Sequence, residues 1–148
     1  MKYKKIILAL SVLIIIMGFA SIILFYINSS AEKPQTQNIS YKDKIVLYDF
    51  TENQKIESPL TIKGKARGTW FFEGSFPIIL VNWDGLIIAQ SYATAKTDWM
   101  TEDYVEFEGK IKFQKPGVYD RGALILQKDN PSGLSEYDDA LEISIEYK

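Results

Sequence analysis

The chain has 148 residues, of which 47% are hydrophobic and 14% aromatic, and this composition excludes an intrinsically disordered protein. Cysteine and histidine are both absent, which excludes disulfides, nucleophile–base pairs that need either residue, and zinc sites built from them. From Asp43 onward twelve Lys and Arg face eighteen Asp and Glu. A net charge of −6 disfavours nucleic acid as a partner, because phosphate backbones attract basic surfaces.

The amino-terminal segment predicts a transmembrane anchor. Residues 1–5 contain three lysines, and residues 6–27 form an uncharged run rich in Ile, Leu and Val. At about 1.5 Å per residue this helix is about 33 Å long, enough to cross a hydrocarbon core of about 30 Å. Because the lysines precede the run, we expect residues 1–5 in the cytoplasm and the rest of the chain outside, as a single-pass protein of the cell membrane.

A cleaved signal peptide is the alternative interpretation of the same segment. Cleavage after Ala20 would leave an apolar new terminus, whereas cleavage after Ala31 follows small residues and fits better. No cysteine is available for lipid attachment, so a lipoprotein is excluded. Residues 28–42 are rich in Ser, Gln and Asn, which predicts a flexible linker.

From Asp43 to Lys148 the sequence is dominated by a period of two residues, typical of strands with one buried face. In the clearest run, 105–113, apolar residues and Gly alternate with Glu and Lys, which places Phe107 and Ile111 in the core. Residues 76–83 are apolar at both parities, as in a strand covered on both faces. We expect seven strands, close to residues 45–50, 60–67, 76–83, 86–95, 105–113, 123–127 and 141–147.

This pattern predicts an all-β protein. Seven strands in about 105 residues, without a convincing helical period outside the anchor, fit an immunoglobulin-like sandwich. We therefore expect one immunoglobulin-like β-sandwich domain over residues 43–148, preceded by one N-terminal transmembrane helix.

The most distinctive stretch places three aromatics, Trp70, Phe71 and Phe72, between Arg67 and Glu73. Each aromatic side chain can bury about 150–250 Å², so at least two of them must be covered by the core or by a partner. Two interpretations of the flanking charges stay open. They form a structural ion pair packed on an indole face, or they bind a ligand.

Trp99 follows Asp98 and has two interpretations of its own, a core plug between sheets or a platform on which a sugar stacks. Binding surfaces favour Trp and Arg, which combine a large area with directed polar groups. We predict that Arg67, Trp70, Glu73 and Trp99 form a partly exposed aromatic and charged surface that contacts a partner.

Metal binding and catalysis have weaker signals. Residues 129–139 hold several carboxylates and amides, the oxygen ligands of calcium, but lack the spacing of calcium loops, so we expect no metal and no cofactor. Without histidine or cysteine, an enzyme would need paired carboxylates or a Ser–Lys pair. Only Glu73 stands in an apolar context that would raise the pKa of a carboxyl, so we expect no catalytic residues and no enzyme.

Several short motifs follow one another in a characteristic order: Gly64-Lys-Ala-Arg-Gly68, Trp70-Phe-Phe-Glu73, Phe76-Pro77, Asp84-Gly85, Asp98-Trp-Met-Thr101 and Asp129-Asn-Pro-Ser-Gly133. In this order and spacing they resemble the immunoglobulin-like domain of bacterial spore germination, from about Ile45 to the carboxyl end. The resemblance implies a bacterial extracytoplasmic sandwich domain without known catalysis.

Together these features predict a membrane-anchored extracytoplasmic interaction module of the bacterial cell envelope, with a role in spore germination or envelope assembly. Its expected partner is an envelope protein, besides the membrane that holds the anchor. The alternative is a glycan- or peptidoglycan-binding module, whose partner is the cell-wall glycan.

Overall fold

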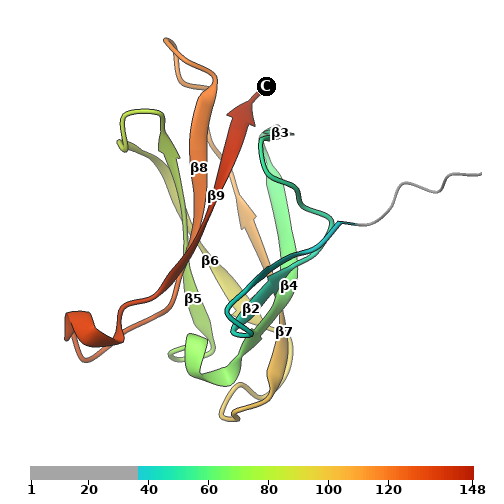
Figure 1. Cartoon of the computed structure of the whole chain (residues 1–148), viewed down its shortest axis with the longest axis vertical. Coiled ribbons are helices and arrows are strands. Elements are labelled where there is room, and N and C mark those ends of the chain that lie inside the picture. Colours follow the sequence, from blue (N-terminus) through green and yellow to red (C-terminus); the bar gives the residue numbers. More distant parts are fainter. Residues whose placement is uncertain (1–36) are drawn as a thin grey trace, which may run out of the picture. The chain divides into compact units, whose positions relative to one another are not determined.

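A computed structural model describes residues 37–148. The predicted anchor at 6–27 and most of the predicted linker lie outside the described residues. Within residues 37–148, no helix is both long and apolar enough to cross a membrane. This part of the chain is all-β, as predicted, and Figure 1 shows its strands joined by loops and turns.

The described residues form nine strands and two short 3₁₀ helices. The strands are β1 (Ile39–Tyr41), β2 (Ile45–Leu47), β3 (Gln54–Ile56), β4 (Leu60–Arg67), β5 (Ser75–Asn82), β6 (Ile87–Ala95), β7 (Tyr104–Ile111), β8 (Arg121–Gln127) and β9 (Ala140–Tyr147), and the 3₁₀ helices are η1 (Gly68–Trp70) and η2 (Ser135–Tyr137).

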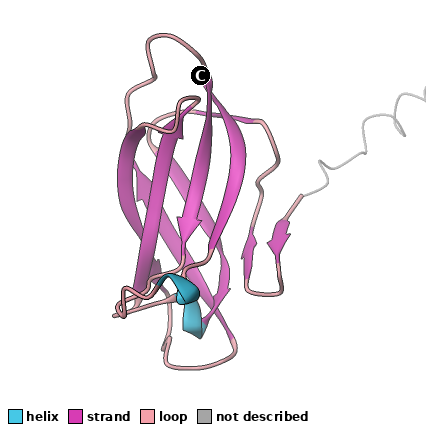
Figure 2. Cartoon of the chain, turned by 60° about the vertical axis from the view of Figure 1, so that its left-hand side comes forward, coloured by secondary structure: helices cyan, strands magenta, loops and turns pink. Residues whose placement is uncertain are grey.

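All nine strands belong to one sheet in the order β1-β2-β4-β7-β6-β5-β8-β9-β3. Every pairing is antiparallel except β3 with β9. β6 pairs with β5 along most of its length but with β7 only through residues 93–95, so the sheet curls there. Its two halves then face each other as the layers of a sandwich (Figure 2), which agrees with the predicted immunoglobulin-like fold.

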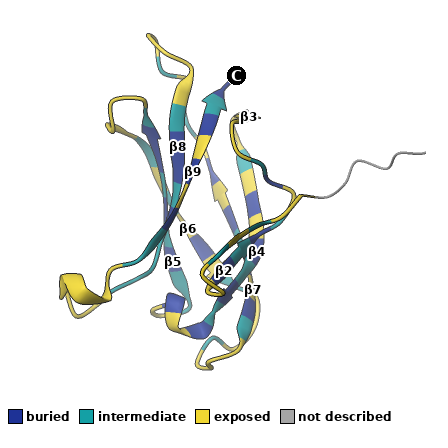
Figure 3. Ribbon diagram, viewed as in Figure 1, coloured by how far each residue is buried: buried dark blue, intermediate teal, exposed yellow. Residues whose placement is uncertain are grey.

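The core lies between these layers, and its side chains alternate along the strands as the sequence predicts. Phe107 and Ile111 of β7 are 2% and 1% exposed, so their predicted core positions are confirmed. Aromatic rings hold the centre together: Phe76 of β5 packs edge-on against Phe107, Phe71 and Trp70. Figure 3 shows the same alternation of buried and exposed positions along the strands.

Two strands are absent from the prediction, β1 and β3. β1 lies inside the segment predicted as a linker, so the ordered sheet begins earlier than Asp43. Both strands have three residues, too few to show an alternating pattern. Turns with left-handed residues position them: Lys42 and Asp43 have φ values of 48° and 54°, and Asn53 has 59°.

Candidate functional site

The four predicted partner-contact residues do not form one exposed surface. Trp70 is 1% exposed and packs edge-on against Phe76, with ring centroids 6.4 Å apart. The prediction assumed an extended segment whose side chains alternate. Instead the chain turns through η1, and both Trp70 and Phe71 point inward while Phe72 is 39% exposed. Trp70 is therefore a core residue, contrary to the predicted surface.

Arg67 is a structural residue with a different partner from the expected one. Its Nη2 lies 2.6 Å from Oδ2 of Asp43, and its Nε donates to the Asp43 carbonyl at 3.0 Å. The guanidinium stacks 4.1 Å from the ring centre of Tyr104, whose hydroxyl donates to the same carboxylate at 2.8 Å. The hydrogen bond from Tyr104 lowers the pKa of Asp43 most, and the one from Arg67 lowers it further. The proposed pairing of Arg67 with Glu73 on an indole face is not found.

Glu73 and Trp99 keep some exposure at this end of the domain. Glu73 is exposed and adopts a left-handed φ of 49°. Trp99 is half-buried, in contact with the core, and its indole covers Gly74. The loop carrying Trp99 is pressed against η1, because a Cβ at Gly68 would overlap the carbonyl oxygen of Thr101. Of the predicted site, Glu73 is exposed, Arg67 and Trp99 are half-buried, and Trp70 is closed to a partner.

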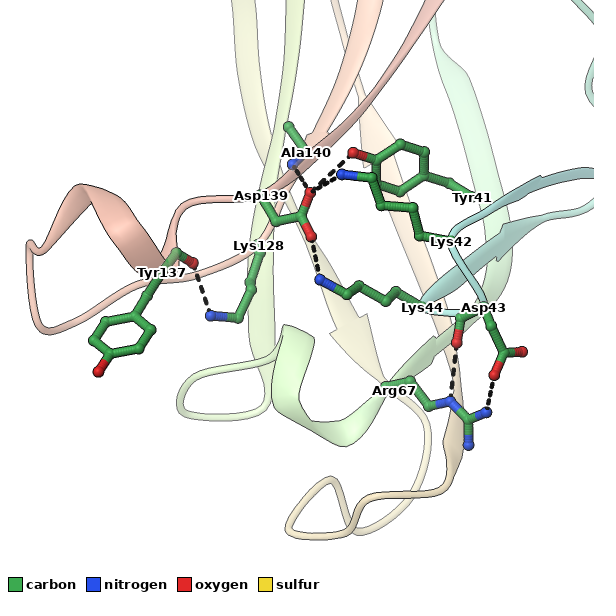
Figure 4. A network of polar contacts seen from close by, with 9 residues as sticks. All are labelled: Tyr41, Lys42, Asp43, Lys44, Arg67, Lys128, Tyr137, Asp139 and Ala140. Atoms are coloured by element: carbon green, nitrogen blue, oxygen red, sulfur yellow. Dashed lines mark hydrogen bonds and ion pairs between the residues drawn. The ribbon is translucent and has the colours of Figure 1, made fainter.

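A second polar cluster fixes the turn between β1 and β2. Asp139 accepts hydrogen bonds from Lys44 at 2.5 Å and from the Tyr41 hydroxyl at 3.0 Å, with Lys42 at 3.6 Å (Figure 4). Burial alone would raise the pKa of Asp139, but the hydrogen bonds from Lys44 and Tyr41 outweigh it and lower the pKa. Because Asp43 in the same turn binds Arg67, the turn is clamped both to β4 and to the segment before β9.

In the oxygen-rich loop at 129–139, Asn130, Ser132 and Asp138 bond to one another. The amide nitrogen of Asn130 donates to the Asp138 carboxylate and to the Leu134 carbonyl, both at 2.8 Å, and its oxygen accepts from Ser132 at 2.6 Å. Within residues 37–148, no group of three or more acidic side chains is arranged to hold a metal ion. Asn130 therefore serves to close the loop.

The structure reveals a surface that the predicted site did not include, on the outer face of the layer formed by β5, β6, β8 and β9. Apolar residues occupy adjacent outward positions, since Pro77 is opposite Tyr92 and Ile79 is opposite both Gln90 and Ile125. Tyr92 and Ile87 on β6 are 62% and 58% exposed, whereas the residues of β5 and β8 are half-buried or buried. We call this surface the apolar strip, formed by Pro77, Ile79, Val81, Ile87, Tyr92, Ala123 and Ile125.

The outer face of the opposite layer is polar and internally paired. Lys63 of β4 is opposite Glu108 of β7, and Lys65 is opposite Glu106. The carboxylate of Glu108 lies 2.6 Å from the Lys96 amine and 3.9 Å from that of Lys63. These contacts lower the pKa of Glu108, and the contact with Lys96 has the larger effect. The two outer faces of the sandwich thus differ sharply in chemistry.

A hollow of about 480 Å³ lies at the end of the apolar strip. Its floor consists of small or short side chains, including Val81, Ala123 and Ser144, which stand side by side on β5, β8 and β9. Trp83 lies at the edge of the hollow and is 57% exposed. Its ring packs edge-on against the ring of Tyr119, with the ring centroids 4.8 Å apart. The polar residues around the hollow are Asn53, Asn82, Arg121 and Glu142.

One sequence signal could have located this surface. The run 76–83 is apolar at both parities, a pattern that predicts cover on both faces. The inward residues Phe76, Ile78 and Leu80 are fully buried, but Pro77 and Ile79 are only half-buried. The apolar residues at the outward-facing positions of β5, a central strand, therefore indicated the apolar strip.

Comparison with known proteins agrees with this architecture. A family model described as the immunoglobulin-like domain of bacterial spore germination matches residues 45–135, more than half of the chain. No curated protein and no solved structure shows a significant match. The matched region runs from the start of β2 into η2, so it contains both outer faces described above except for β9. The chain therefore belongs to the family of immunoglobulin-like domains of bacterial spore germination.

Proposed function

We propose that this protein is an extracytoplasmic interaction module, held at the cell membrane by residues 6–27, that binds an envelope protein through the apolar strip. The observation that carries the proposal is the contrast between the two outer faces. One carries facing lysines and glutamates, with Glu108 paired to Lys96 and Lys63. The other presents adjacent apolar side chains, of which Tyr92 and Ile87 are well exposed and Pro77, Ile79 and Ile125 are half-buried.

Physical chemistry favours a partner on such a face. Soluble domains rarely expose contiguous apolar patches, and burying apolar surface contributes about 25 cal/mol per Å². The exposed rings and branches of Tyr92 and Ile87 offer the largest gain. Gln90 and Glu142 stand beside Ile79 and Ile125, which gives the apolar centre a polar rim, as in many protein interfaces.

The shape of the strip indicates the kind of partner. Its residues lie on three neighbouring strands of one layer, β6, β5 and β8, so the surface is broad. A flat apolar surface is complementary to the apolar face of another sheet or helix, and charged polymers gain little there. The proposed occupant is therefore an envelope protein with an apolar face, and we assign the domain no catalytic role.

The proposed location rests on the sequence and on the family. The lysines before residues 6–27 favour a cytoplasmic amino terminus, which puts residues 37–148 on the outer side. The family to which the chain belongs, the immunoglobulin-like domains of bacterial spore germination, supports an extracytoplasmic interaction module.

A pair of matched charge substitutions in the full-length protein tests the proposal. Ile125→Lys introduces a cation into the apolar strip, across from Glu142 on β9. Thr61→Glu introduces an anion into the polar face, across from Lys110 on β7. Because each new charge faces a side chain of opposite charge, both variants should keep the melting temperature within a few degrees. Proteins that co-purify with the wild type from solubilised membranes should be lost with Ile125→Lys and retained with Thr61→Glu. Equal retention by both variants would overturn the proposed surface.

A further inference from the structure

We propose that the hollow beside Trp83 is a carbohydrate site that takes one or two residues of a β-linked glycan carrying N-acetyl groups. This goes beyond protein binding by the apolar strip, and only its choice of an envelope glycan rests on the proposed extracytoplasmic location. The hollow has the three parts that such a ligand requires: a rigid aromatic wall, a floor of small side chains and unpaired polar groups around the rim.

The aromatic wall is held in place before any ligand arrives. Trp83 lies in the β5–β6 turn, where the side-chain oxygen of Asn82 accepts hydrogen bonds from the backbone of Asp84 at 3.0 Å and Leu86 at 2.8 Å. The ring of Tyr119, from the β7–β8 loop, supports the indole edge-on. Figure 1 shows both loops at the same end of the domain as the carboxyl terminus. A ring fixed in this way loses little conformational entropy on binding.

The floor leaves room for a flat ligand next to this ring. Val81 is opposite Ala123, and Ala123 is opposite Ser144, so three short side chains adjoin across β5, β8 and β9. The volume of about 480 Å³ lies within the range of small-molecule sites. The C–H groups on the face of a pyranose ring are attracted to the negative face of an indole, which favours stacking of a sugar on Trp83.

The rim supplies hydrogen-bonding groups of both kinds. Within residues 37–148, the side chains of Arg121, Glu142 and Asn53 form no hydrogen bond or ion pair with one another or with other described residues. Arg121 offers only donors, Glu142 offers acceptors, and Asn53 offers both. Hydroxyl groups and the amide of an N-acetyl group need this combination, because each carries a donor and an acceptor.

The charge of the hollow favours a neutral ligand. The positive charge of Arg121 balances the negative charge of Glu142, so the lining residues provide no net attraction for an anion or a cation. A larger hollow of about 570 Å³ lies beside Ile87 and Ile88, but its charged lining residues are lysines, without an acid. That hollow lacks the balanced acceptors and donors of the site beside Trp83.

The experiment measures binding of chitotetraose, the β-1,4-linked tetramer of N-acetylglucosamine, to the purified full-length protein by isothermal titration calorimetry. Wild type should bind it, and cellotetraose, which lacks the acetamido groups, should bind more weakly. Trp83→Ala should weaken chitotetraose binding at least about tenfold, equivalent to about 1.4 kcal/mol. Tyr92→Ala removes an equally exposed aromatic of the same layer outside the hollow, and should change the affinity less than about twofold.

A second variant tests the site without removing Trp83, so that loss of binding is not confused with misfolding of Trp83→Ala. Ser144→Tyr fills the hollow from an exposed floor position and should also abolish binding while the melting temperature is kept. Failure of the wild type to bind chitotetraose, or unchanged binding by Ser144→Tyr, would overturn the site, and equal affinity for both sugars would overturn the N-acetyl assignment. Tyr92→Ala removes the most exposed side chain of the apolar strip and leaves the lining of the hollow intact, so it should weaken capture of the envelope protein while sugar binding is retained, and loss of one proposal is distinguishable from loss of the other.

Discussion

Phe76 of β5 and Phe107 of β7 meet in the centre of the sandwich, edge to face, with ring centroids 4.9 Å apart. The strands belong to opposite layers, which are connected through β6 at the curl of the sheet. This contact therefore joins the layer that carries the apolar strip to the layer that carries the charge pairs. The same Phe76 ring also touches Phe71 and Trp70, which explains why the aromatic stretch is part of the core.

The first prediction concerns this contact. Phe107→Ala should lower the free energy of unfolding by about 3–5 kcal/mol, because it leaves a cavity against Phe76 and Gly64. Glu108→Ala, one residue on, should cost less than about 1 kcal/mol, since it removes only exposed ion pairs with Lys96 and Lys63. Urea denaturation of both variants measures the difference, and similar losses would contradict the observed alternation.

A glycine that allows two segments to approach each other gives the second prediction. Gly68→Ala should destabilise the domain by about 2 kcal/mol or more, because its Cβ overlaps the backbone carbonyls of Thr101 and Trp99, which are not free to move away. Gly117→Ala is the matched control, because a Cβ at Gly117 meets open space. Thermal unfolding should show a marked decrease for Gly68→Ala alone, and an unchanged melting temperature would mean that the 99–101 loop is not pressed on η1.

The Asp139 cluster gives a prediction about pH. In the folded state the pKa of Asp139 lies below its ordinary value of 3.8, so its carboxylate stabilises the fold at higher pH. This contribution is fully present above about pH 4 and is lost as the pH falls through the lowered folded pKa. Asp139→Asn should therefore cost about 1–2 kcal/mol at pH 7, and the difference from wild type should shrink below about pH 3.5. A difference that stays constant down to pH 2 would contradict the assignment of the stabilisation to the ionised carboxylate.

Topology is the fourth prediction. Protease added to intact cells after removal of the wall should digest residues 37–148 and leave a small membrane-bound fragment that contains residues 6–27. The expectation follows from the lysines that precede the apolar run. Recovery of an undigested domain inside protease-treated cells, with a cytoplasmic control protein equally protected, would contradict the extracytoplasmic location.

Most of the strands could be predicted from the sequence, because the alternation of buried and exposed residues along a strand is a local property of the chain. Val105 to Ile111 alternates in sequence as it does in burial, and its register with β4 places Lys63 opposite Glu108. Short elements were not predictable in this way. β1 and β3 have three residues each and depend on turns and on pairing with distant strands.

The predicted exposure of Trp70 and the predicted pairing of Arg67 with Glu73 are wrong for a different reason, which is that side-chain partners in a sandwich are distant in sequence. Arg67 binds Asp43, 24 residues away, and not the nearby Glu73. The 3₁₀ turn of η1 also breaks the alternation that was assumed for Trp70. The apolar strip and the Trp83 hollow combine residues from several strands, so only the apolar outward parity of β5 indicated them in the sequence.

Site-directed photo-crosslinking in cells tests directly whether the apolar strip contacts an envelope protein. A photoreactive phenylalanine analogue is placed at Tyr92 on the strip or at Tyr137 in η2, two tyrosines of comparable exposure on different surfaces. We expect a discrete crosslinked adduct with another envelope protein from position 92 and none from position 137. Equal adducts from both positions, an adduct with a second copy of this chain alone, or no adduct from position 92 would contradict it.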